Sequence, residues 1–313
     1  MISFMRRFAA LLAIAAGLLS MTPGLALACA CGCGVFDVGA SSLFPSGLGG
    51  KAFVEYDFMD QNQNHSGSSA APAADNGDKE IKTDFVTFGA QYMFNHDWGV
   101  MAEAPVWDRF FATENDAGSG VNNFDHTAIG DIRLRGMYTG FSHDMSTGVT
   151  FGLKLPTGDW RYPNFDRDTE IGTGSTDLLL GAFHRGALTK DNSFSYFVQG
   201  QVDLPMAGQG GYIPGDEFDG AIGAHYNGLT ADNGKLTISP IAQMLVSLRA
   251  SDRGLNADPA DSGYSRLIFS PGVEVAMGDW ALYGDVEIPI FQYYNGDQLA
   301  APYAVKVILS HAF

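Results

Sequence analysis

Apolar and polar residues alternate along most of the chain after about residue 50, in segments separated by clusters of Gly, Asp and Asn. In residues 235–250, Leu236 and Ile238 begin an apolar face, and Lys235 and Thr237 begin a polar one. A period of two is typical of a β-strand with one face toward an apolar medium. The pattern predicts twelve strands, at about residues 51–60, 82–95, 98–111, 127–141, 146–156, 175–188, 194–205, 217–229, 235–250, 264–277, 280–294 and 301–313.

The connections between these strands are alternately short and long. Short ones such as His96-Asp97 and Gly278-Asp279 are typical of hairpin turns. The long, polar connections cover about 61–81, 112–126, 157–174, 206–216, 251–263 and 295–300. An antiparallel sheet with this alternation has its short turns at one end and its long loops at the other, as outer-membrane barrels do.

We therefore expect an all-β fold, an antiparallel up-and-down transmembrane β-barrel of about twelve strands with both termini in the periplasm. The expected location is the outer membrane of a Gram-negative bacterium. The alternative is a secreted soluble β-sandwich or repeat protein. The segments are longer than the roughly 5–6 residues of most soluble strands and match the roughly 9–11 that a tilted membrane strand needs, which favours the barrel.

The end of the chain points the same way. In the last segment, Tyr303, Val305 and the alternate residues up to His311 share a face with the terminal Phe313. This pattern resembles the C-terminal assembly signal of bacterial outer-membrane barrels, although His311 departs from the usual apolar residue. The resemblance implies the barrel-assembly machinery as a partner, and outer-membrane lipid and lipopolysaccharide as surroundings.

The first residues predict export. Arg6 and Arg7 precede an apolar stretch, and Ala26-Leu27-Ala28 has the small-x-small pattern of a signal-peptidase site. We therefore divide the chain into a signal peptide (1–28), a Cys- and Gly-rich periplasmic segment or small plug (29–50) and the barrel (51–313). Pro45 and four glycines make residues 35–50 unsuitable as a lipid-facing strand.

Three cysteines, Cys29, Cys31 and Cys33, would stand at the start of the mature chain. As thiolates they are candidate ligands for a soft ion such as Cu(I) or Zn²⁺. Two alternatives stay open: lipid attachment at Cys29, and a disulfide that leaves one thiol free or intermolecular. Apart from this possible Cu or Zn, the sequence predicts no cofactor.

Composition excludes one class of partner. The 313 residues carry 18 Lys and Arg against 35 Asp and Glu, a formal charge of −17. Nucleic acid, whose phosphates require a basic surface, is therefore not an expected partner. We place most of the acidic surplus on the long loops, where it would attract cations to a pore mouth.

The faces opposite the apolar ones define an expected lumen, since a Lys or Arg facing lipid at the midplane costs about 2–4 kcal/mol. The candidate pore-lining residues are Glu103, Arg109, Asp131, Arg133, Arg135, Lys154, Arg185, Arg249, Arg266, Glu274, Asp285 and Glu287. With Lys51, Glu55, Asp57, Asp177, Asp203, Asp219, Lys235 and Lys306 they make ten acids and ten bases. This balanced set either pairs up to hold the barrel together or lines a water-filled path.

Residues 152–184 read GLKLPTGDWRYPNFDRDTEIGTGSTDLLLGAFH. The pair LKLPTGD and GTGSTDLLLGA resembles the transporter-like outer-membrane family named for the meta-cleavage pathway of phenol degradation. The resemblance implies a single outer-membrane barrel that passes small or aromatic solutes, and it brings no catalytic residues. The glycines and Pro156 suit strand ends and a re-entering loop, so the motif has a structural interpretation as well as a functional one.

No enzyme motif stands out. The chain has no GxSxG, and its seven His residues are dispersed. We expect a non-enzymatic outer-membrane channel or transporter for small solutes, aromatic ones included, by passive diffusion. The alternative is a structural or accessory barrel whose N-terminal cysteines bind a soft metal ion or a periplasmic partner.

Overall fold

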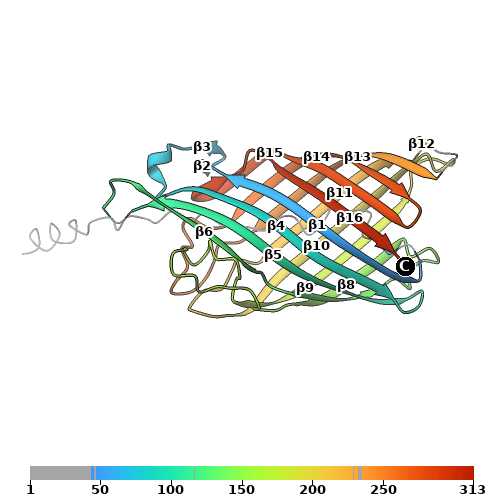
Figure 1. The fold of residues 1–313 in the computed structure, drawn as a ribbon, viewed down its shortest axis with the longest axis horizontal. Helices are drawn as coiled ribbons and strands as arrows, with labels where there is room; N and C mark the ends of the chain where they lie inside the picture. The colour runs from blue at the N-terminus through green and yellow to red at the C-terminus, as the bar shows by residue number, and fades with distance from the viewer. Residues whose placement is uncertain (1–43, 46, 116, 228, 232–234) are drawn as a thin grey trace, which may run out of the picture.

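Twelve long strands wind into one closed antiparallel barrel, as the alternation predicts (Figure 1). The computed structural model describes residues 44–45, 47–115, 117–227, 229–231 and 235–313, so the predicted signal peptide and the three cysteines lie outside the described residues. In order around the wall, the strands are β1 (Gly49–Gln61), β4 (Asp78–Met93), β5 (Trp98–Glu114), β6 (Val121–Ile129) with β7 (Arg133–Tyr138), β8 (Thr147–Lys154), β9 (Ser175–Ala187), β10 (Phe194–Gly208), β11 (Glu217–Tyr226), β13 (Leu236–Arg249), β14 (Tyr264–Met277), β15 (Trp280–Ala300) and β16 (Ala304–Ala312).

The first and last strands close the wall. β1 pairs with β16 from Lys51 opposite Ala312 to Met59 opposite Ala304. Beyond this ladder, the amide of Gly50 donates to the carbonyl of Phe313 at 2.8 Å, and the amide of Phe313 donates back at 2.9 Å. The pairing of β1 with β16 joins the two ends of the sheet, and such closure is what a membrane-spanning sheet requires.

The outside of the barrel is apolar all the way round. Each of the twelve wall strands exposes at least one large apolar side chain: Val54, Phe88, Val100, Leu134, Phe151, Leu180, Val198, Ile222, Leu248, Phe269, Val286 and Leu309. Soluble monomers rarely expose connected apolar patches larger than a few hundred Å². A complete apolar belt is therefore a lipid-facing surface.

The two ends of the barrel differ as expected. Figure 1 shows the first long connection, which carries β2 (Gln63–Gly67), β3 (Ser69–Ala70) and the short 3-10 helix η2 (Ala73–Asp75), at the end opposite the C-terminus. β12 (Leu229–Ala231) is a short extension that pairs with β13. None of the described residues belong to a helix with the length and apolar character that crossing a bilayer requires.

Several element boundaries differ from the predicted ones. β1 begins at Gly49, two residues before the predicted start of the first strand at residue 51. The strand predicted over 127–141 is broken between β6 and β7, where Asp131 turns inward to bind a loop. The connection predicted over 295–300 belongs to β15 instead: the strand continues through an irregularity at Gly296, whose φ is +60°, and Asp297–Ala300 pair with β2. The connection from β15 to β16 is residues 301–303.

Candidate functional site

The inside of the barrel is ionic. All twelve candidate pore-lining residues are buried or half-buried there. Arg109 is fully buried, and Arg135 forms an ion pair with Glu103 on the neighbouring strand. Lys235 is a correction to the predicted set of ten bases, since it lies exposed beside the start of β13 instead of inside.

Two lysines each form ion pairs with two carboxylates of other strands. Lys154 on β8 forms ion pairs with Asp177 on β9 and, at 3.6 Å, with Asp203 on β10. On the other side of the lumen, the ammonium of Lys306 lies 3.8 Å from Glu55 and 3.7 Å from Asp57. Each cluster has two acids for one base. Buried charges in such clusters are tolerated because they are paired.

A hydrogen-bond network holds one oxygen of another buried acid, Asp285. Its Oδ2 atom accepts hydrogen bonds from Ser270 Oγ at 2.6 Å, from the Tyr283 hydroxyl at 2.6 Å and from Gln243 Nε2 at 2.9 Å. These donors lie on β14, β15 and β13. The network fixes the inner face of three neighbouring strands.

Asp131, in the break between β6 and β7, ties down both ends of the long connection 155–174. Its Oδ1 atom accepts the amide of Gly158 at 2.9 Å, and its Oδ2 atom accepts the amide of Thr173 at 2.8 Å and the Thr173 hydroxyl at 2.6 Å. Gly158 and Gly172 touch, and a Cβ added to Gly158 would lie 2.6 Å from the Gly172 Cα atom. The residues LPTGD and GTGSTD thus form the neck of this loop, which accounts for the motif structurally.

The same loop folds into the barrel instead of projecting from it. The guanidinium of Arg109 donates from Nε to Thr83 Oγ1 at 2.9 Å and from Nη1 to the carbonyl of Thr169 at 2.5 Å. Thr169, Glu170 and Ile171 are buried as a result. The sequence predicted an outer loop at 157–174. The loop folds inward because a buried cation on β5 binds its backbone carbonyls.

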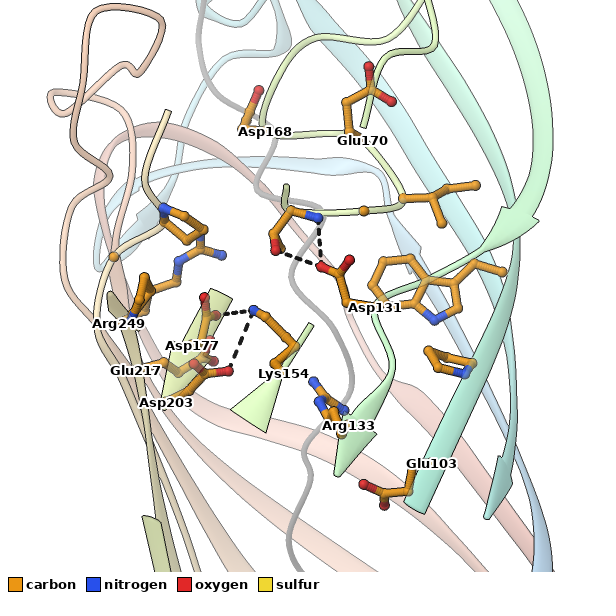
Figure 2. A pocket seen from close by; sticks show the side chains of 18 of the residues that line it. Glu103, Asp131, Arg133, Lys154, Asp168, Glu170, Asp177, Asp203, Glu217 and Arg249 are labelled. Carbon is orange, nitrogen blue, oxygen red and sulfur yellow. Dashed lines mark hydrogen bonds and ion pairs between the residues drawn. The ribbon is translucent and has the colours of Figure 1, made fainter. Parts of the chain in front are cut away.

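A cavity lies between this loop and the wall. It contains about 1150 Å³ of space not filled by protein atoms and is open to solvent. Figure 2 shows Asp168 and Glu170 on the loop side and Lys154, Asp177 and Asp203 on the wall. The carboxylates that line it are Glu55, Glu103, Asp131, Asp168, Glu170, Asp177, Asp203, Glu217 and Asp219, and the cationic side chains are Arg133, Lys154, Arg167 and Arg249.

Three of these acids lie inside the barrel although the sequence did not predict an interior position for them. We placed Asp168, Glu170 and Glu217 on the loops and their edges. Glu217 begins β11, where its Oε1 atom accepts hydrogen bonds from the hydroxyls of Tyr264 at 2.7 Å and Ser247 at 3.2 Å. Glu217 and Asp219 are two residues apart on the same strand and so share a face, and this spacing could have predicted the inward position of Glu217. The local sequence carries no comparable signal for Asp168 and Glu170.

Burial changes the acidity of the loop. It raises the pKa of Glu170 to about 7, against the partly opposing effects of the Tyr162 backbone amide and the Arg167 and Arg109 guanidiniums. Burial also raises the pKa of Asp166 above its usual value. The carboxyl of Glu170 therefore changes charge near neutral pH.

An apolar layer lies inside the wall next to the ionic region. It joins Phe53 on β1, Phe183 and Phe197 on β9 and β10, and residues of β11 and β13–β16. Phe44, which precedes β1, completes this layer and is 5% exposed. The neighbouring carbonyl of Pro45 accepts a hydrogen bond from Arg185 Nη2 at 2.9 Å. The segment before β1 thus enters the barrel at residues 44–45.

The metal prediction falls outside this site. Cys29, Cys31 and Cys33 lie outside the described residues. Within the described part of the chain, no group of three or more His, Cys, Asp or Glu side chains is arranged to hold a metal ion.

Comparisons with known proteins support the fold. No family model matches the chain, and no curated protein sequence matches it. An outer-membrane channel from Pseudomonas putida F1 superposes with a TM-score of 0.67 at 12% identity, covering 88% of this chain and 100% of that one. The β-domain of the Bordetella autotransporter BrkA gives a TM-score of 0.52 at 11% identity, covering 85% and 100%. The fold is that of Gram-negative outer-membrane barrels.

Proposed function

We propose that the protein is an outer-membrane channel through which small solutes cross by passive diffusion. The ionic cavity inside the wall carries this proposal. Replacing a buried ion pair with well-packed apolar residues is often neutral or stabilising, so stability alone does not explain an interior with nine carboxylates around one cavity. Charged and polar walls are instead what a water-filled path for solutes requires.

Two elements would restrict the path to small solutes. The loop 155–174 occupies part of the lumen and is held by Arg109 and Asp131. The apolar layer around Phe183 and Phe197 narrows the path next to the cavity. Twelve strands also stand between small barrels whose interiors are filled by side chains and the wide porins of 16–18 strands.

The proposal also includes aromatic compounds among the small solutes that pass through the channel. The motif at residues 152–184 resembles the family named for phenol degradation, and Trp107 and Tyr212 line the cavity. An aromatic solute would stack on such rings. The motif forms the neck of the loop 155–174 whichever solute passes.

The second candidate is a structural or accessory barrel. The apolar layer favours it, because the layer extends over neighbouring strands from β9 round to β1 and includes Phe44 from outside the wall. In this account the segment 29–43 with its cysteines, not the lumen, would bind a metal ion or a periplasmic partner.

Single-channel recording of the purified, full mature chain in planar bilayers distinguishes the two candidates. The channel proposal predicts discrete conductance steps and uptake of small solutes into liposomes, with larger solutes excluded. A correctly folded barrel that gives neither would support the accessory candidate. Adding phenol to one chamber tests the aromatic part, because a phenol that enters the path should reduce the ionic current.

A further inference from the structure

Four methionines gather inside the barrel. Met93, Met137 and Met145 are 2%, 2% and 4% exposed and pack on one another, and the half-buried Met101 packs against them. The chain has eleven methionines, three of which belong to the predicted signal peptide. Half of the methionines of the predicted mature chain therefore lie in this one group, which we call the methionine cluster.

The strand register brings two of these side chains to one place. Met93 at the end of β4 pairs with Gly99 on β5, and Gly99 pairs in turn with Met137 on β7. A Cβ atom added to Gly99 would overlap the sulfur of Met93 and would lie 3.1 Å from the methyl carbon of Met137. The two thioethers thus lie over the same glycine, which has no side chain to separate them.

Met145 joins the cluster from the turn between β7 and β8. Its φ is +55°, and Asn192 is the only other non-glycine residue with a positive φ in the described part of the chain. A residue with a Cβ atom is strained in this region, so Gly or Asn is usual at such a turn position. The turn instead holds a buried thioether there, inside the cluster.

The neighbouring apolar layer has a different composition. Its ten buried residues that the structure describes are Phe, Tyr, Ile, Leu and Ala, with no methionine among them. Leu and Met have similar volumes and replace one another easily in a core, and Met is usually an occasional gap filler. Three buried methionines in contact are therefore more than packing requires, and what distinguishes them from Leu is the sulfur.

The cluster borders open space in the lumen. Met101 and Met137 line a second cavity, with about 650 Å³ of space not filled by protein atoms, open solvent included. The charged side chains of its lining form two ion pairs, Arg135 with Glu103 and Lys306 with Glu55. An ion in this cavity can therefore approach two sulfurs where the cationic side chains are already paired with carboxylates.

We propose that the methionine cluster binds a soft monovalent metal ion of the Cu(I) type through its thioether sulfurs. Thioethers are soft ligands that select Cu(I), whereas hard cations such as Mg²⁺ and Ca²⁺ require oxygen ligands. Met93, Met137 and Met145 supply the buried sulfurs, and Met101 connects them to the cavity. The site uses none of the three N-terminal cysteines and does not depend on the proposed channel function.

A silver titration followed by NMR of methyl-labelled methionines tests the site, with Ag(I) as an air-stable probe of the same soft class. The protein is the full mature chain in detergent with Cys29→Ser, Cys31→Ser and Cys33→Ser, in chloride-free buffer, because thiolates and chloride would otherwise bind the ion. We expect the four cluster methyl signals to shift and to saturate at one ion per barrel, before the exposed Met206 and Met277 respond. Mg²⁺ should shift none of these signals.

Met→Leu variants in the same background locate the ion, because Leu keeps the volume of the side chain but has no sulfur. Met93→Leu should weaken Ag(I) binding about tenfold, equivalent to about 1.4 kcal/mol. Met145→Leu should have a similar effect and provides a second variant in case the first misfolds. Met59→Leu is the matched control and should leave the affinity unchanged, because Met59 is equally buried but packs in a different apolar cluster. Circular dichroism checks that each variant keeps its β-structure.

The outcomes separate this site from the channel proposal. Equal Ag(I) affinities in Met93→Leu, Met145→Leu and Met59→Leu would overturn the site, as would parallel shifts of all methionine signals without saturation. Saturable binding at the cluster in a barrel without conductance would retain the site and reject the channel. Conductance without Ag(I) binding at the cluster would do the reverse.

Discussion

The ring of Phe44 stacks on the ring of Phe183, with centroids 4.9 Å apart and planes 9° from parallel. Phe44 also meets Phe197 edge to face at 5.9 Å. Phe183 and Phe197 belong to neighbouring wall strands, whereas Phe44 precedes the first strand. A residue from outside the wall therefore completes the apolar layer inside the lumen.

Replacing Phe44 with Ala should widen the path. The change removes the burial of a Phe side chain, worth about 3–5 kcal/mol in a packed core, but no strand pairing, so we expect a larger single-channel conductance from a barrel that still folds. The matched control is Leu48→Ala, which alters an exposed apolar side chain in the same segment. Equal conductance in the wild type and both variants would show that Phe44 does not limit the path.

Removing the Arg109 side chain should release loop 155–174. Arg109→Ala loses hydrogen bonds from a charged donor to the Thr169 carbonyl and to Thr83, each worth about 1.5–3 kcal/mol. We expect limited trypsin digestion to cut faster after Arg161 and Arg167 in this variant. Arg253→Ala removes an exposed ion pair with Asp216 and serves as the control. Unchanged cleavage in Arg109→Ala would mean that other contacts hold the loop.

The neck of the loop should depend on Asp131. Asp131→Ala leaves the amides of Gly158 and Thr173 without their carboxylate acceptor, so we expect a loss of about 3 kcal/mol in the free energy of unfolding. Urea titration monitored by tryptophan fluorescence measures this loss. Asp125→Ala, which changes an exposed acid on neighbouring β6, should stay within about 0.5 kcal/mol of the wild type. Similar stabilities for both variants would contradict the neck role.

These contacts show which features of the structure the sequence pattern does not predict. Alternation predicted the wall, because a strand between lipid and lumen has two chemically different faces and a one-residue shift reverses both. The position of loop 155–174 depends on Arg109, which is about sixty residues from Thr169 along the chain. No local periodicity encodes such a contact. The acids carried by that loop, Asp168 and Glu170, were therefore assigned to the outside.

Cation preference should depend on pH through Glu170. Burial raises the pKa of this carboxyl to about 7, with Asp159 adding to the rise and Arg167 and Arg109 opposing it. The carboxyl is neutral below that pH and charged above it. Raising the pH from 6 to 8 should therefore increase the preference for K⁺ over Cl⁻, read from the zero-current potential in a KCl gradient.

The same titration in Glu170→Gln isolates this group, because the amide does not ionise. We expect the pH-dependent part of the zero-current potential between pH 6 and 8 to be smaller in the variant. An identical pH dependence in the variant and the wild type would assign the effect to other groups.

The most direct test of the channel account is the zero-current potential of the full mature protein in a planar bilayer with a tenfold KCl gradient at pH 8. The carboxylates that line the cavity predict measurable single-channel current and a potential of the sign that marks selectivity for K⁺. Exposed loop charges are screened over about 8 Å at physiological salt, so a preference set inside the lumen should persist as the mean salt concentration rises. A folded, inserted barrel that carries no current, or one that selects Cl⁻, would contradict the account.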